Sequence, residues 1–145
     1  MIDVPRDDMV MMLEAGYLYL AMGKYTEAKQ IFEGVSVLAP KHEVPRVGLG
    51  NVLFAQKKFL PAIRVLKEAL KLKADSAFAH AHLGEALLFH GKKGEALEEL
   101  KTAAELEPKG KAGDFARSLT ELINMGYDPV KLKKESPKKT SVKSA

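Results

Sequence analysis

The feature that most constrains the fold is a repeat of 34 residues. Glycine and alanine both return at this spacing, at Gly16, Gly50 and Gly84 and at Ala28, Ala62 and Ala96. The stretches around the three glycines align without a gap. A short repeating unit cannot bury its own apolar face, so successive units must stack and share one core. The sequence therefore predicts three stacked units, at residues 9–42, 43–76 and 77–110.

Each unit reads as two amphipathic helices. Apolar residues recur at spacings of three and four, as at Ala96, Leu97, Leu100 and Ala103, which is the period of a helix with one buried face. Breaks fall inside the units at residues 23–24, 56–58 and 91–93 and close to their ends at prolines. Small residues at facing positions allow the two helices of a hairpin to approach closely. We expect an all-α fold of stacked helical hairpins.

The segment after the third unit predicts a helix that covers the last hairpin. An apolar stripe runs through Phe115, Leu119, Leu122 and Ile123, with Asp114 as the expected N-cap of a helix over about 113–126. This gives seven helices and a domain over residues 1–126. Residues 127–145 carry six lysines against two acidic residues, with few apolar side chains, so we expect a basic, disordered tail.

At this level of detail the sequence resembles the tetratricopeptide repeat (TPR) proteins. The third unit carries their pattern most completely, at Leu83, Gly84, Leu87, Ala96, Leu100, Ala103 and Pro108. The departures are modest, with Ala15 at the leucine position of the first unit and Ala74 at the proline position of the second. The resemblance implies a right-handed superhelical stack of three hairpins plus a C-terminal capping helix.

The sequence offers no assembled catalytic, metal or cofactor site. No cysteine is present. His80 and His82 are two residues apart on a helix and point to different sides, and His80 stands where the repeat places a packing residue. Glu98 and Glu99 lie on an expected surface helix with no opposing acid or histidine in view. No phosphate-binding glycine motif occurs. We expect a protein that is not an enzyme and takes no cofactor.

In TPR proteins the first helix of each unit lines a concave groove that binds protein segments. The resemblance assigns the groove of this chain to Val10, Leu13, Glu14, Tyr17, Leu20, Val47, Asn51, Phe54, Phe78, His82, Glu85, Leu88 and Phe89. Most of these side chains are apolar, and they suit a partner segment with apolar anchors. For each of them, packing against other helices is an equally open interpretation.

One TPR activity can be tested on the residues themselves. Members of the family that bind the acidic tails of heat-shock chaperones use a clamp of Lys, Asn and Arg. The equivalent positions here are Val10, Glu14, Gly48, Phe78 and His82. Almost every cationic donor is missing, and a carboxylate would meet Glu14. The sequence argues against heat-shock chaperone tails as partners.

A narrower resemblance is to small TPR chaperones of bacterial type III secretion, of the SycD/LcrH type or the needle-subunit type. It is carried by the stretch from Phe32 to Ile63 and by the length of the chain. It implies a chaperone that shelters an apolar segment of a secretion substrate. The alternative is a general TPR scaffold or assembly factor in another multiprotein complex. Homo- or hetero-oligomers are compatible with both.

The charge distribution bears on nucleic acid as a partner. The net charge of +4 comes from residues 127–145, because the other 126 residues hold 17 basic and 17 acidic groups. A lysine tail could attract nucleic acid, but a solvated tail is the simpler interpretation, so nucleic acid is not the expected partner. No apolar run is long enough for a membrane span, and no signal peptide is evident. We expect a cytoplasmic protein that does not insert into membranes.

Overall fold

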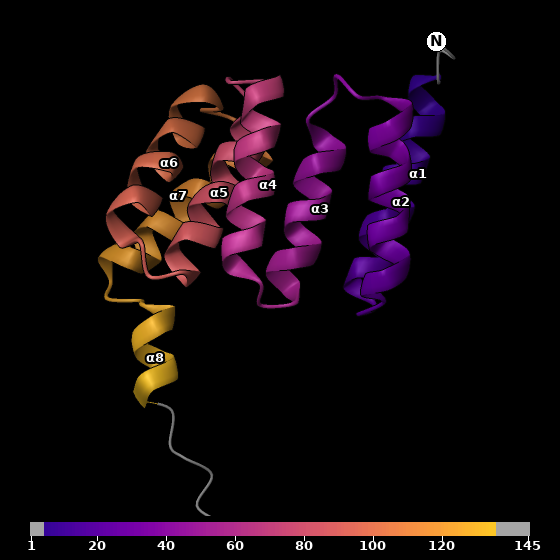
Figure 1. Ribbon diagram of the computed structural model, residues 1–145. Coiled ribbons are helices and arrows are strands. Elements are labelled where there is room, and N and C mark those ends of the chain that lie inside the picture. The colour runs from indigo at the N-terminus through magenta and orange to yellow at the C-terminus, as the bar shows by residue number, and fades with distance from the viewer. Residues whose placement is uncertain (1–4, 136–145) are drawn as a thin grey trace, which may run out of the picture.

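The computed structural model describes residues 5–135, and it is all-helical over that range. Helices follow one another as antiparallel pairs across the molecule, from α1 and α2 at one end to α5 and α6 near the other (Figure 1). The described residues form α1 (Arg6–Ala21), α2 (Tyr25–Leu38), α3 (Val44–Ala55), α4 (Phe59–Leu72), α5 (Ala77–Phe89), α6 (Lys93–Leu106), α7 (Lys111–Asn124) and α8 (Pro129–Glu135).

The two helices of each hairpin are held together by one repeated contact. A glycine of the first helix faces a large apolar side chain of the second, as Gly16 faces Phe32 and Gly84 faces Leu100. A Cβ atom built on Gly84 would lie 2.7 Å from Leu100 Cγ, which is closer than atoms can pack. Gly50 and Leu66 repeat this arrangement in the second hairpin. The 34-residue spacing of the glycines is therefore set by how closely the paired helices approach.

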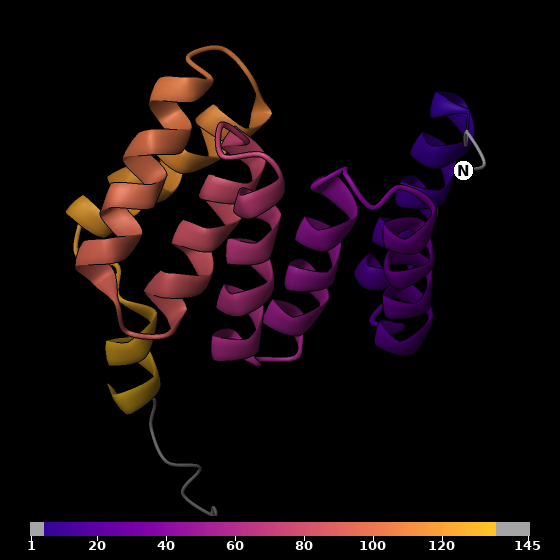
Figure 2. The same ribbon diagram turned by 45° about the horizontal axis from the view of Figure 1, so that its top comes forward.

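The buried side chains form two clusters. The smaller cluster lies between the first hairpin and α3, around Ala28, Phe32 and Val52, and the larger one runs from Val47 through the later hairpins to α7. Helix α7 packs on both α5 and α6 and contributes Ala116, Leu119 and Ile123 to the larger cluster. The turned view in Figure 2 shows α7 beside these two helices. The last hairpin is thus covered by an element outside the three units.

Two details of the C-terminal part differ from the sequence-based expectation. Helix α7 begins at Lys111 with Gly110 as its N-cap, so Asp114 lies in the first turn and pairs with Arg117 instead of capping. The expected tail also contains an eighth helix. Asp128 Oδ1 accepts hydrogen bonds from the backbone N–H groups of Val130 (3.0 Å) and Lys131 (3.2 Å), which caps α8.

Helix α8 contacts α5, and Val130 Cγ2 lies 3.7 Å from the position that a Cβ atom of Gly91 would take. The expectation of disorder over the whole of 127–145 was therefore wrong for α8. The remaining residues of that tail, 136–145, lie outside the described part of the chain.

The turns inside the hairpins share a left-handed residue. Gly23 has φ 73° and Gly91 has φ 85°. In the second hairpin the equivalent residue is Lys57, with φ 62°, and it is the one non-glycine residue with positive φ between residues 5 and 135. A side chain in this conformation costs about 1–2 kcal/mol relative to a right-handed residue.

We expect Lys57→Gly to raise the free energy of unfolding by about 0.5–1 kcal/mol, because the strain removed exceeds the entropy that glycine adds to the unfolded chain. Chemical denaturation measures the change. Lys58→Gly is the matched control, since Lys58 has φ −94° and gains nothing from glycine. A Lys57→Gly variant that is no more stable than the parent would contradict the assignment of strain to this turn.

Candidate functional site

One face of the stack is formed by the first helices of the hairpins. Helix α1 contacts α3, α3 contacts α5, and α5 contacts α7, whereas α2, α4 and α6 do not contact one another in the described part of the chain. Successive helices in direct contact lie on the shorter side of a curved array. We call the surface formed by α1, α3, α5 and α7 on that side the inner face.

A polar link joins the first two helices of the inner face. Asn51 Nδ2 on α3 donates a hydrogen bond of 3.0 Å to the Tyr17 hydroxyl on α1. The Tyr17 ring also packs edge-on against Phe32, with centroids 5.0 Å apart. Burial raises the pKa of the Tyr17 phenol from 10.0 to about 12, and the hydrogen bond from Asn51 opposes part of this increase. Tyr17 therefore supports the fold as well as the surface.

The raised pKa of Tyr17 predicts a loss of stability at high pH. The folded state favours the neutral phenol, so this contribution, on the order of 2 kcal/mol, is fully present below pH 10 and is lost as the pH rises through about 12. In an absorbance titration of phenolate, Tyr17→Phe should remove the tyrosine that ionises near pH 12. If the step at highest pH persists in Tyr17→Phe, the burial assigned to this hydroxyl is wrong.

Three phenylalanine rings meet where α3, α4 and α5 adjoin. Phe54 and Phe89 contact each other in an edge-on geometry with centroids 4.9 Å apart. Phe59, at the start of α4, lies 5.4 Å from Phe54 and 5.7 Å from Phe89. All three rings are only partly buried. They form a patch of aromatic surface in which each ring contacts the other two, so that the contacts restrict the rotation of each ring.

A second group of rings joins α5 to α7. His82 lies edge-on to Phe78, with centroids 4.8 Å apart, and stacks on Phe115 at 5.3 Å and 25°. Glu85 Oε1 lies 3.4 Å from His82 Nδ1, one turn further along the same helix. All four residues are partly exposed. This end of the inner face thus combines aromatic surface with one carboxylate and one imidazole.

The structure divides the sequence-predicted groove residues into three classes. Val47 and Leu88 are core residues, 0% and 1% exposed, and offer no surface to a partner. Asn51 is also buried, with its amide bound to Tyr17. The partly or fully exposed residues are Val10, Leu13, Glu14, Tyr17, Leu20, Phe54, Phe78, His82, Glu85 and Phe89.

Residues that sequence reasoning left out of the groove also belong to these ring groups. Phe59 and Phe115 lie outside the first helices of the three units, and TPR register alone therefore does not select them. Phe59 begins a second helix, and Phe115 belongs to the apolar stripe of the capping helix. The available signal was an aromatic residue directly after the turn of the second hairpin, at Phe59, and another in the closing helix, at Phe115.

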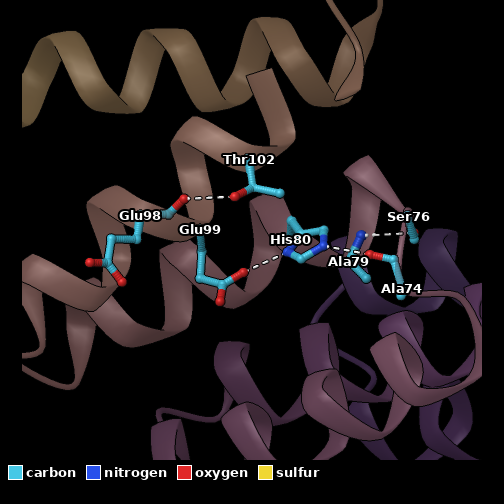
Figure 3. A network of polar contacts seen from close by, with 7 residues as sticks. All are labelled: Ala74, Ser76, Ala79, His80, Glu98, Glu99 and Thr102. Carbon is cyan, nitrogen blue, oxygen red and sulfur yellow. Dashed lines mark hydrogen bonds and ion pairs between the residues drawn. The ribbon is translucent and has the colours of Figure 1, made fainter. Parts of the chain in front are cut away.

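His80 has a different role from the expected packing residue. Its Nδ1 lies 2.6 Å from Glu99 Oε2 on α6, and its Nε2 lies 2.8 Å from the backbone carbonyl oxygen of Ala74, which precedes α5 (Figure 3). The expectation that Glu98 and Glu99 face no histidine was therefore wrong for Glu99. Because both partners of the ring accept hydrogen bonds, each contact requires a proton on the facing nitrogen. Facing Glu99 and the Ala74 carbonyl, His80 connects α5, α6 and the turn before α5.

The described residues carry no arrangement of three or more His, Cys, Asp or Glu side chains suited to a metal ion. None of the helices between residues 5 and 135 has the length and apolar character needed to cross a membrane.

Comparison with known proteins agrees with this architecture. A family model described as tetratricopeptide repeat matches residues 11–42. No curated protein matches the chain at a significant level. Among solved structures, the Yersinia enterocolitica type III secretion chaperone SycD, in complex with a peptide of the translocator YopD, is 25% identical with a TM-score of 0.67, and the match covers 92% of this chain and 100% of SycD.

Two further structures show the range of similar proteins. The first TPR domain of Spaghetti (RPAP3), bound to the HSP90 peptide SRMEEVD, is 25% identical, with a TM-score of 0.67 and coverage of 86% of this chain and 99% of that domain. PcrH from Pseudomonas aeruginosa has a TM-score of 0.70 over 85% of this chain and 94% of PcrH, but at 17% identity it shows the shared fold alone.

Proposed function

We propose that this tetratricopeptide-repeat protein is a non-catalytic binding module that holds an apolar segment of a partner protein on its inner face. The observation that carries the proposal is the set of partly exposed rings on that face, joined at its edge by Phe59 of α4. Phe54, Phe59 and Phe89 form one group, and Phe78 and Phe115 flank His82 in the other. Partly exposed aromatic side chains held by their neighbours are the usual anchors of protein interfaces.

The more specific form of the proposal is a type III secretion chaperone. SycD, whose structure resembles this chain over nearly its whole length, was solved with a peptide of a translocator protein. An apolar inner face suits a substrate segment that would aggregate if it were left exposed. As such a chaperone, the protein would hold its substrate before export, in the cytoplasm.

A general TPR scaffold is the alternative function, and co-purification from the native host separates the two. A secretion chaperone is expected to recover one apolar partner at equal stoichiometry, and that partner should aggregate when it is produced alone. A scaffold would recover several proteins that are stable without it. Recovery of several stable proteins would overturn the chaperone form of the proposal and leave the binding module intact.

The inner face is unsuited to the acidic tail of a heat-shock chaperone. Val10, Glu14 and Phe78 stand at positions where a clamp would need cationic or amide donors, and Glu14 is exposed, so its charge would repel a carboxylate. We expect the peptide SRMEEVD, which the RPAP3 domain binds, to bind this protein with a Kd weaker than about 1 mM. Calorimetry with the RPAP3 domain as positive control measures this, and micromolar binding would contradict it.

A further inference from the structure

A pocket lies outside the inner face described above, where the ends of the second and third hairpins meet. It has a volume of about 290 Å³. Its walls come from the start of α3, from the turn between α4 and α5, and from the end of α6. The lining residues are Glu43, Val44, Lys73, Asp75, Ser76, Ala77, Phe78, Leu106 and Glu107.

The unusual residue in this wall is Glu43. It is 7% exposed, and its Oε2 atom is buried without a hydrogen-bond partner. Between residues 5 and 135, no ion pair involves its carboxylate, and it makes no capping bond to α3. Burial of a carboxylate without a partner is costly, and proteins ordinarily pair such a group with a cation or a donor. Glu43 lines the pocket, so a partner bound there lies next to this carboxylate and can reach Oε2 once the side chain rotates.

The other walls fit a long cationic side chain. Asp75 and Glu107 are also acidic lining residues, although the Glu107 carboxylate lies against Gly110, and neither residue forms an ion pair within the described residues. Val44, Phe78 and Leu106 add apolar surface, against which the methylene groups of a cationic side chain can pack. The Ser76 hydroxyl is already engaged, since it accepts a hydrogen bond of 3.1 Å from the Ala79 N–H and caps α5.

We propose that this pocket binds the guanidinium group of an arginine side chain from a partner polypeptide. Glu43 supplies a buried acceptor without a partner, the acidic residues Asp75 and Glu107 add negative charge to the other walls, and a planar guanidinium carries five donors that can bind a carboxylate through two of them. The Phe78 ring supplies an aromatic surface of the kind on which guanidinium groups stack. A metal ion is a poorer fit, because these carboxylates do not form a cluster of metal-binding geometry in the described residues.

The pocket adjoins the inner face through one shared residue. Phe78 lines the pocket and also packs against His82 in the second ring group. A segment anchored on the inner face can therefore place an arginine in the pocket. This role in partner selection rests on the proposed function, whereas the affinity of the pocket for guanidinium does not.

Lys73 allows the electrostatic part of the proposed guanidinium binding to be tested. It is the one cation in the lining, it is exposed, and it has no ion-pair partner within residues 5–135. Its positive charge opposes the binding of a second cation at the same wall. Removal of Lys73 should therefore strengthen guanidinium binding, whereas a purely structural role for these residues gives no such effect.

The test is an NMR titration of the full-length, ¹⁵N-labelled protein with N-acetyl-arginine amide. The neutral isostere N-acetyl-citrulline amide is the matched control ligand. We expect saturable shifts of the Val44 and Ala77 amides with the arginine compound, and no saturation with the citrulline compound at the same concentrations. Glu43→Gln should weaken binding about tenfold or more, and Lys73→Ala should tighten it several-fold.

Glu121→Gln is the control variant, because Glu121 is exposed on α7, away from the pocket lining. The proposal would be overturned by shifts of amides near many surface carboxylates or by equal binding of the two compounds. Equal effects of Glu43→Gln and Glu121→Gln would overturn it as well. Thermal melting checks that Glu43→Gln is folded, and if it is not, the citrulline and Lys73→Ala comparisons still decide. The probe lacks apolar anchors, so failure here is distinct from failure of the inner face to bind a partner.

Discussion

Phe32→Ala is expected to lower the free energy of unfolding by about 3–5 kcal/mol, because it removes a large, fully buried ring from a core that cannot close around the cavity. The Phe32 side chain is 0% exposed and is the largest in the core of the first hairpin. Its ring lies between two glycines, since Cβ atoms built on Gly16 and Gly48 would come within 2.8 Å and 2.4 Å of it. The glycines leave no side chain that could fill the cavity.

The measurement is chemical denaturation followed by circular dichroism, with Val37→Ala as control. Val37 lies on the same helix but is 79% exposed, so its truncation should change stability by less than about 0.5 kcal/mol. A loss below about 1 kcal/mol in Phe32→Ala would show that the contacts of this ring with Gly16 and Gly48 do not hold the first two hairpins together.

The same geometry predicts that Phe32 and Gly48 are coupled. Gly48→Ala alone should destabilise by about 1–3 kcal/mol, because its methyl group would overlap the Phe32 ring. The next unit carries the smaller Leu66 and the larger His82 at the equivalent positions. Phe32→Leu should therefore relieve part of the cost of Gly48→Ala, and a double-mutant cycle should give a favourable coupling of about 0.5–3 kcal/mol.

The hairpins could be predicted from the sequence because their packing contact repeats. Gly16, Gly50 and Gly84 each face a large side chain on the paired helix, and a contact made three times leaves a visible period. Helix α8 occurs once and has no such period. Its capping residue Asp128 is followed by Pro129, a pairing that also fits the end of the preceding helix, and the lysines that follow favour disorder.

The candidate site was less predictable, because exposure depends on contacts between units. The positions of Val47 and Leu88 within the TPR repeat predicted that both line the groove, but neighbouring helices bury both side chains. Contacts between side chains of different helices could not be predicted from the spacing of residues within one helix either. Glu99 meets His80 from 19 residues away, and the buried Glu43 carboxylate is at the surface in any interpretation that considers only its own helix end.

The second large effect concerns binding. Phe54→Ala and Phe89→Ala should each weaken the affinity for the partner by about 1–3 kcal/mol, because both rings are partly exposed members of one aromatic group. Affinity should change little between low and moderate salt, since few charges lie on this face. Calorimetry with the co-purified partner measures both quantities.

Leu60→Ala is the matched control for these two variants. Leu60 is 43% exposed on α4, next to Phe59 but outside both ring groups. It should leave affinity unchanged, and melting curves should establish that all three variants are folded. Affinity that is insensitive to both phenylalanine truncations, or that collapses with added salt, would move the binding site to another surface such as the lysine-rich C-terminal segment.

Contact between the inner face and the partner can be detected by site-specific photo-crosslinking in the native host. A photoreactive phenylalanine analogue would replace Phe78 or Phe89 on the inner face, and Val37 on α2 or Leu60 on α4 as controls. We expect both inner positions to yield an adduct with the same polypeptide and the controls to yield none. Adducts from Val37 or Leu60 alone would show that the partner binds elsewhere.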